Sequence, residues 1–182
     1  MNAATDNRNV IDYYKYWNED AIKASLDKVR FNFIVAIENF DKDFNISTTI
    51  RNCNAFTGKE VWILGRRRWD RRGAVGTHHY EHLRFGESIE DVIDEHPGYR
   101  VVVFENYDNA QDIREYDWNE KTIMVFGQES IGVTEKALSL ADDVVYIPQF
   151  GSTRSLNVGV ASGIAMYSYV EKFGNYESSL SS

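Results

Sequence analysis

Residues 147–161 read IPQFGSTRSLNVGVA, and this stretch decides how the end of the chain folds. The β-branched run at residues 144–147 predicts a buried strand, after which a polar loop leads into a last helix. Ser155 and Asn157 stand where the first amides of a helix lack backbone partners. Helical spacing then repeats on one face, at Leu156, Val160, Ile164 and Tyr167. Small residues also let this helix pack closely, namely Gly159, Ala161, Gly163 and Ala165.

Upstream of this stretch, short apolar runs alternate with amphipathic segments, a pattern typical of an α/β domain with a mostly parallel sheet. A length of 182 residues fits one domain. Further strands are predicted at residues 33–37, 61–64, 101–104 and 123–126, with a weaker one near 82–85. Helices are predicted at residues 47–56, 88–95 and 134–140.

The two ends of the chain are expected to lie outside this domain, which covers residues 31–174. Residues 1–30 form a helical extension in this interpretation, because Val10, Tyr13, Tyr14 and Trp17 fall at helical spacing. Three roles suit that extension: packing on the core, joining a dimer interface, and contacting RNA. Residues 175–182 include SSLSS and are expected to be a flexible tail.

Composition and net charge exclude several classes of protein. No apolar run of membrane-spanning length appears, and the polar start MNAATDNRN resembles neither a signal peptide nor a transit peptide, so we expect a cytoplasmic protein without membrane contact. Cys53 is the one cysteine, which excludes an internal disulfide and favours a small buried side chain. The net charge of −8 argues against a surface that binds nucleic acid all over.

Positive charge is nevertheless concentrated at residues 66–72, which read RRRWDRR. A solvated loop would explain such a run, but Trp69 among arginines also suits single-stranded RNA, where aromatic rings stack on bases and guanidinium groups hold phosphates. The candidate RNA-binding residues are Arg66, Arg67, Arg68, Trp69, Arg71 and Arg72.

Common catalytic and nucleotide-binding motifs are missing. The chain has no GxGxxG after its first strand, no GxxxxGK[ST] and no GxSxG. His78, His79 and His82 have no cysteine partner and no HExxH arrangement, so exposed loop histidines are favoured over a metal site and no metal is expected.

Two more polar segments follow predicted strands, where ligands of open α/β sheets bind. Residues 39–58 read NFDKDFNISTTIRNCNAFTG, with Asn45 able to cap a helix and Arg51 in its second turn. Residues 123–135 read IMVFGQESIGVTE, where Gly127 and Gly132 bracket a tight turn carrying Glu129. Taken singly, each segment is also explained by local capping.

Together, in this order and spacing, the segments resemble the three motifs of the SpoU family, also called the TrmH family, of SPOUT methyltransferases. NISTTIR at 45–51 is similar to the first motif, FGQESIG at 126–132 to the second and IPQFGSTRSLNVGVA at 147–161 to the third. The resemblance extends over roughly residues 33–172.

The resemblance implies a domain whose C-terminal segment passes through a loop as a deep trefoil knot, a rare topology. It implies S-adenosyl-L-methionine as the cofactor, bent within the knot and held mostly by backbone groups. The residues that the resemblance assigns to the cofactor are Phe104, Glu105, Gly127, Ile147 and Leu156.

The same resemblance implies methyl transfer to a ribose 2'-hydroxyl of RNA by a homodimer, in which Arg51 of one subunit serves the site of the other. Arg51 is expected to position the substrate and stabilise charge, since guanidinium rarely loses a proton. The residues expected to shape the site with it are Asn45, Glu129, Ser155 and Asn157.

Target choice stays open between tRNA, which suits a single small domain, and rRNA. The chain has only the short N-terminal extension where some relatives carry an RNA-binding domain, and it lacks long basic tails. Two alternatives remain: a catalytically idle RNA-binding or assembly factor that keeps the knot, and a base methyltransferase of the same superfamily. The intact motif residues and the SLNV element argue against them.

Overall fold

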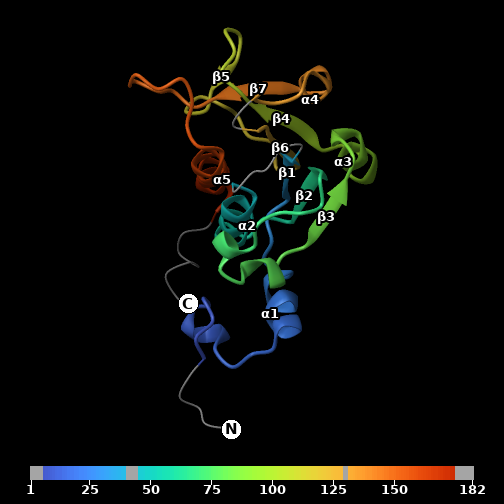
Figure 1. Cartoon of the computed structure of the whole chain (residues 1–182), viewed down its shortest axis with the longest axis vertical. Helices are drawn as coiled ribbons and strands as arrows, with labels where there is room; N and C mark the ends of the chain where they lie inside the picture. Colours follow the sequence, from blue (N-terminus) through green and yellow to red (C-terminus); the bar gives the residue numbers. More distant parts are fainter. Residues whose placement is uncertain (1–5, 40–44, 129–130, 175–182) are drawn as a thin grey trace.

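The computed structural model describes residues 6–39, 45–128 and 131–174. In this part of the chain seven strands form one sheet in the order β3-β2-β1-β6-β4-β7-β5, and every neighbouring pair is parallel (Figure 1). The strands are β1 (Phe33–Asn39), β2 (Glu60–Gly65), β3 (Leu83–Gly86), β4 (Arg100–Phe104), β5 (Gln111–Asp112), β6 (Thr122–Phe126) and β7 (Asp143–Tyr146).

The predicted strands are confirmed, including the weaker one near residues 82–85. Every residue of β1 and β6 is buried, because helices cover both faces of the sheet and leave no polar side for these strands. β5 was not predicted: its two residues, Gln111 and Asp112, are polar and too few to form a pattern.

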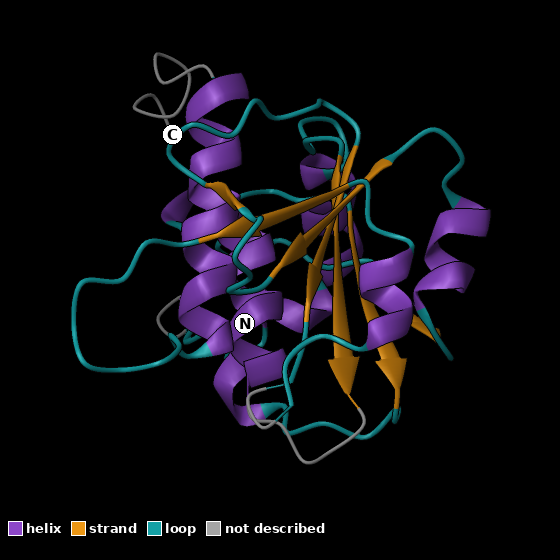
Figure 2. Cartoon of the chain, turned by 90° about the horizontal axis from the view of Figure 1, so that it is seen from above, coloured by secondary structure: helices purple, strands orange, loops and turns teal. Residues whose placement is uncertain are grey.

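Helices lie on both sides of the sheet (Figure 2). α2 (Asn45–Ala55) and α5 (Val158–Phe173) lie side by side and bury Ile50, Cys53 and Tyr169 against one face. α3 (Ile89–Glu95) and α4 (Glu135–Ser139) cover the other face. The predicted burial of Cys53 is confirmed.

Small residues bring α5 close to α2, as predicted. A Cβ atom on Gly159 would lie 2.8 Å from Thr48, and one on Gly163 would lie 3.1 Å from Asn52. The apolar face that the helical spacing predicts is present, but it points outward: Val160, Ile164 and Tyr167 are 51%, 37% and 52% exposed. The chain therefore leaves an apolar surface along α5 uncovered.

The predicted helical extension contains an α-helix, but not at residues 10–17, whose spacing suggested it. Only a 3-10 turn, Asp12–Tyr14, forms there, since Tyr16 has a left-handed φ of 69° that interrupts any helix. α1 (Glu19–Leu26) starts later, where the Asn18 side chain accepts from the amide of Ala21 at 2.7 Å. Aromatic packing therefore explains the spacing of Tyr13 and Trp17, whose ring centroids are 5.1 Å apart.

Buried contacts fasten this extension to the domain. The Arg30 guanidinium donates to the Tyr80 carbonyl at 2.7 Å and pairs with the buried Glu81 carboxylate at 3.0 Å. α1 lies at the opposite end of the molecule from β5 and β7 (Figure 1). Across the described ranges, no helix combines the length and the apolar character needed to cross a bilayer.

Candidate functional site

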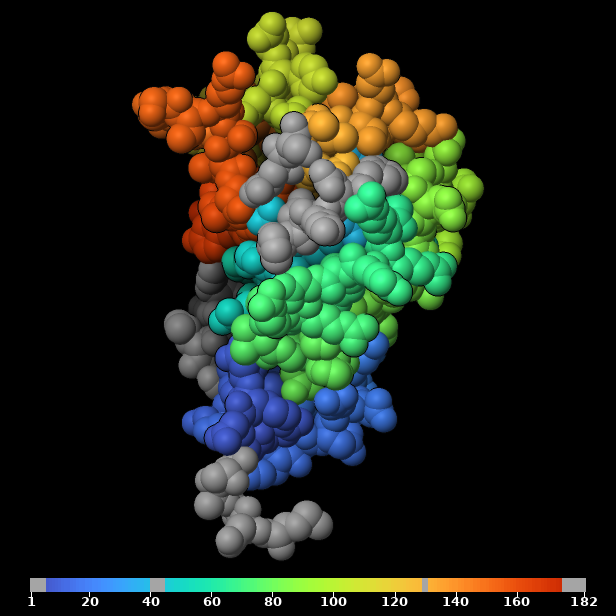
Figure 3. All heavy atoms as spheres, viewed as in Figure 1, coloured from blue at the N-terminus to red at the C-terminus, as the bar shows by residue number. Residues whose placement is uncertain are grey.

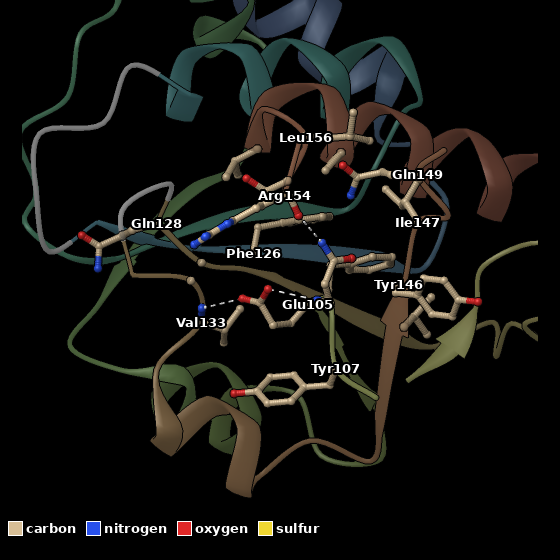
Figure 4. Close-up of a pocket in the computed structure, with 18 of the residues that line it drawn as sticks. Glu105, Tyr107, Phe126, Gln128, Val133, Tyr146, Ile147, Gln149, Arg154 and Leu156 are labelled. Carbon is tan, nitrogen blue, oxygen red and sulfur yellow. Dashed lines mark hydrogen bonds between the residues drawn. The ribbon is translucent and has the colours of Figure 1, made fainter. Parts of the chain in front are cut away.

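A cavity of about 460 Å³ opens at the carboxyl ends of β4, β6 and β7 (Figure 4). This is the edge at which open parallel sheets bind ligands. Apolar side chains form much of its wall, including Phe104, Phe126 and Val133, and the loop between β7 and α5 closes one side. The five residues expected to hold a cofactor all line it, namely Phe104, Glu105, Gly127, Ile147 and Leu156.

The floor of the cavity depends on two glycines. Gln128 and Gly132 exchange backbone hydrogen bonds of 3.0 and 2.8 Å, which folds the chain back sharply after β6. A Cβ atom on Gly127 would lie 2.2 Å from the carbonyl carbon of Gly132, and Gly132 itself has a φ of 73°. A side chain at Gly127 would clash with the backbone of the turn, and the left-handed φ of Gly132 favours glycine there. Glu129, predicted to shape the site, lies outside the described residues.

Glu105 presents a fixed carboxylate to the cavity. Its Oε1 accepts from the Asn106 amide at 3.0 Å and its Oε2 from the Val133 amide at 3.2 Å. The Asn106 side chain in turn donates to the Arg154 carbonyl at 3.1 Å (Figure 4). The end of β4, the turn after β6 and the loop before α5 are therefore joined around one carboxylate.

A buried carboxylate, that of Glu38, supports the turn from behind. Glu38, at the end of β1, accepts from the Thr134 amide at 2.9 Å and from the Thr134 hydroxyl at 2.5 Å. Burial raises the pKa of Glu38, and the two hydrogen bonds oppose part of that shift. Glu38 was not identified from the sequence because it lies inside an apolar strand and belongs to none of the quoted segments.

The first and third segments meet beside the cavity. Asn157 Nδ2 donates to Asn45 Oδ1 at 2.8 Å, and Asn157 Oδ1 caps α5 by accepting from the Val160 amide at 3.2 Å. Ser155 lines the cavity and is exposed. The structure thus brings Asn45 and Asn157 into contact and places Ser155 in the cavity wall, two residues before Asn157.

Arg51 does not line the cavity of its own chain. It lies six residues after Asn45, about 9 Å further along α2, on an exposed stripe that also contains Thr48 and Ala55. The buried stripe of α2 faces the sheet, and its Asn52 amide donates to the Gly159 carbonyl of α5 at 2.7 Å. Arg51 is therefore exposed on α2, the helix that packs beside α5.

The arginine-rich loop, residues 66–72, follows β2 and lies on the front of the molecule (Figure 3). Asn39 donates to the carbonyls of Arg66 and Arg68, and Ser47 donates to that of Asp70, so the end of β1 and the start of α2 anchor the loop. The side chains of Arg66, Arg67, Arg68, Arg71 and Arg72 are exposed.

Trp69 differs from the arginines around it. Its ring is half-buried and packs against the core, with the His78 ring edge-on at 5.7 Å and the Arg71 guanidinium 5.9 Å from its centroid. Arg72 is paired with Asp70 at 2.5 Å, which lowers the pKa of Asp70 to about 2. Within the described ranges, no group of three His, Cys, Asp or Glu is arranged to hold a metal ion.

Several cavity residues were missed from the sequence. Gln128 is 3% exposed, and neither atom of its amide has a hydrogen-bond partner among the described residues; the same holds for Oε1 of Gln149. Both lie within the quoted segments, whereas Asn106 and Tyr107 only follow a strand end and carry no motif. Arg154 also lines the cavity, one residue before the serine that was singled out.

This chain has the fold of known RNA-modifying enzymes. It is similar to the crystal structure of the A. aeolicus TrmH/SpoU tRNA modifying enzyme, with a TM-score of 0.75, 25% identity, and coverage of 86% of this chain and 84% of that one. An AdoMet-bound rRNA methyltransferase from Sinorhizobium meliloti shares the fold at 22% identity and a TM-score of 0.70.

The sequence identifies the family. Residues 32–167 match the SpoU rRNA methylase family, and the chain belongs to that family. It is 34% identical over 138 residues to the tRNA (guanosine(18)-2'-O)-methyltransferase of Escherichia coli K12, covering 73% of this chain and 60% of that protein. The Thermus thermophilus enzyme of the same name is 32% identical over 143 residues, with 73% and 71% covered. The chain thus spans about 60% of the length of the first of these relatives.

Proposed function

We propose that this chain transfers a methyl group from S-adenosylmethionine to the 2'-hydroxyl of a ribose in tRNA, at a guanosine. The observation that carries the proposal is that the second and third motif segments line one cavity, while the Asn45–Asn157 hydrogen bond joins the first segment to the third beside it. The names of the curated relatives support tRNA and guanosine over rRNA. Residues 31–174 form the catalytic domain in this proposal, with residues 1–30 as an accessory extension.

The cavity fits S-adenosylmethionine. Phe104, Ile147 and Leu156 offer apolar surface to an adenine ring, and Gly127 lets a ligand approach the backbone closely. Among the described residues, the buried amide of Gln128 has no hydrogen-bond partner, and a ligand in the cavity would supply one. Glu105 keeps a free lone pair on each oxygen for hydroxyl or ammonium donors.

The cofactor supplies an electrophilic methyl group on a sulfonium, so the protein must mainly position and activate the ribose hydroxyl. We assign Arg51 to hold the target nucleotide and stabilise negative charge on the attacking oxygen, because a planar guanidinium can hold an oxyanion through parallel hydrogen bonds. Asn45 and Asn157 set the shape of the site through their mutual hydrogen bond. Ser155 and Glu129 complete the polar surroundings in this proposal.

The active form is a homodimer in this proposal. Arg51 lies outside the cavity of its own chain, while Val160, Ile164 and Tyr167 leave an apolar face on α5. A second copy packed on that face would bury it and bring Arg51 toward the partner's cavity. We also assign the C-terminal segment to the deep trefoil knot of the SPOUT fold, and the arginine-rich loop to RNA phosphates.

Methyl transfer from labelled S-adenosylmethionine to unmodified tRNA, followed by nucleoside mass spectrometry, tests the proposal. We expect 2'-O-methylguanosine from the wild type and at least about a hundredfold less from Arg51→Ala, with unchanged melting. Arg51→Lys keeps the charge but not the planar fork, so it should recover activity only partly. Arg84→Gln, which removes a surface arginine paired with Glu95, is the matched control.

Full activity of a well-folded Arg51→Ala variant would refute the role of Arg51. Methylation of a base would refute the proposed reaction and favour a base methyltransferase. Cofactor binding without transfer to tRNA or rRNA would refute it too and favour a catalytically idle RNA-binding protein.

A further inference from the structure

Arg154 and Glu105 are the only charged side chains among the described residues that line the cavity. The rest of the lining is apolar or uncharged. No ion pair joins the two across the described part of the chain, and the Arg154 guanidinium has no hydrogen-bond partner there. The cavity therefore presents one positive and one negative group, both available to a ligand.

Asn106 links the backbone segments that carry these two charges. Asn106 donates its backbone amide to the Glu105 carboxylate at 3.0 Å and its side-chain amide to the Arg154 carbonyl at 3.1 Å. One residue therefore connects the end of β4 to the loop before α5. Figure 4 shows the Arg154 side chain extending along the cavity toward the side of Gln128, on the opposite side from Tyr146.

The charge pattern distinguishes between possible ligands. A nucleotide phosphate entering the cavity would gain from Arg154 but would be repelled by the Glu105 carboxylate. A zwitterion with a carboxylate at one end and cationic or hydroxyl donors elsewhere satisfies both groups. S-adenosylmethionine has this pattern, with one carboxylate, one ammonium, one sulfonium and two ribose hydroxyls.

We infer that Arg154 binds the carboxylate of the methionine moiety and so makes the site selective for a cofactor that carries this group. The inference rests on the proposed function and adds a residue that contacts the cofactor. A guanidinium can hold a carboxylate through two parallel hydrogen bonds, which gives geometric selectivity as well as affinity. Glu105 then remains available to the donors of the same ligand.

Isothermal titration of the full chain with S-adenosylmethionine and with decarboxylated S-adenosylmethionine tests the inference. We expect the wild type to bind the intact cofactor about ten- to a hundredfold more tightly. Arg154→Gln should bind S-adenosylmethionine about ten- to a hundredfold more weakly than the wild type does. It should bind the decarboxylated analogue with the affinity of the wild type. Arg154→Lys should keep part of the preference, and Arg84→Gln, which removes the same charge outside the cavity, should keep all of it.

The contrary outcomes are distinct. Equal loss of affinity for both ligands in Arg154→Gln, or no preference in the wild type, overturns the inference and leaves the proposed function standing. The inference is also overturned if Arg154→Gln binds the cofactor as tightly as the wild type but has a raised KM for tRNA. That result would assign Arg154 to the RNA phosphate. Failure of the wild type to bind either ligand would overturn the proposed function itself.

Discussion

Asn157 Nδ2 donates a 2.8 Å hydrogen bond to Asn45 Oδ1, joining two residues that lie 112 positions apart in the chain. The same Asn157 caps α5 through its Oδ1, while Asn45 begins α2. Two helices that pack on one face of the sheet are therefore aligned at their first turns. The cavity lies beside this contact, so the alignment of the helices and the shape of the site are linked.

The two functions of Asn157 can be separated by substitution. Asn157→Asp keeps an oxygen that caps α5 but cannot donate to Asn45, whereas Asn157→Ala removes both interactions. We expect Asn157→Ala to lower the free energy of unfolding by about 1 kcal/mol more than Asn157→Asp, measured by urea denaturation. Equal decreases would show that the cap contributes nothing measurable.

Gly127 should not tolerate a methyl group. A Cβ atom there would lie 2.2–2.3 Å from backbone atoms of Gly132 and Val133, so the turn must open. We expect Gly127→Ala to cost about 1–3 kcal/mol of stability and to abolish cofactor binding, as measured by denaturation and titration. Gly151→Ala is the matched control, because no heavy atom of the described residues, its two chain neighbours aside, lies within 4 Å of its Cβ position. Normal binding by Gly127→Ala would contradict the proposed site.

The raised pKa of Glu38 predicts that the stability of the folded chain depends on pH. Burial raises the pKa of Glu38 in the folded chain above its ordinary value of 4.5. Between the unfolded and folded pKa values the folded state binds more protons, so the contribution of Glu38 to stability is present at low pH and is lost as pH rises through the folded pKa.

Glu38→Gln removes this titration and keeps the shape of the side chain, with an amide that can donate to the Thr134 hydroxyl. We expect the variant to gain stability relative to the wild type as pH is raised from about 4 to about 8, followed by denaturation at each pH. Glu87→Gln, at an exposed glutamate, controls for the removal of one charge. A difference that does not vary with pH would contradict the raised pKa.

The arginine-rich loop should contribute to tRNA affinity in a salt-dependent way. Replacing Arg66, Arg67 and Arg68 with Gln should weaken binding and reduce the slope of log K against log salt by about 0.7–0.9 for each phosphate that these side chains neutralise. Fluorescence anisotropy at several salt concentrations measures both the affinity and the slope.

The matched control for the loop removes three arginines that are paired with carboxylates elsewhere: Arg84, Arg100 and Arg114. It changes the net charge equally and should leave the slope nearly unchanged. The loop assignment fails if the two triple variants behave alike.

The exposed face of α5 should be an interface between two copies of the chain. Ile164→Glu places a charge on the apolar face and should shift the protein toward monomer in sedimentation velocity experiments, with loss of methyl transfer. Val29→Glu, at an exposed apolar residue outside α5, is the control. A wild type that is monomeric at working concentrations would contradict the prediction.

A mixing experiment tests whether Arg51 acts across that interface. Arg51→Ala keeps an intact cavity, whereas Gly127→Ala, which we expect to lose cofactor binding, keeps an intact Arg51. A mixed dimer therefore contains one complete site, so activity should return when the two inactive variants are combined. Recovery would not occur if Arg51 served its own chain.

The sequence by itself determined most of the secondary structure, because burial on both faces of a parallel sheet selects continuous apolar runs such as those of β1 and β6. It also determined the family, since the motif residues at 45–51, 126–132 and 147–161 keep their order and identity. Local pattern failed in the N-terminal extension, where Tyr13 and Trp17 pack on each other instead of forming a helix.

Only the tertiary structure decided which of these residues share a site. The Asn45–Asn157 hydrogen bond, the Asn106 link to Arg154 and the Glu38 support behind the turn all join residues far apart in the chain. Such interactions depend on strand order and helix packing, which no local spacing encodes. The same packing turns Arg51 away from the cavity and leaves the apolar face of α5 uncovered, because α2 and α5 bury their other faces against the sheet.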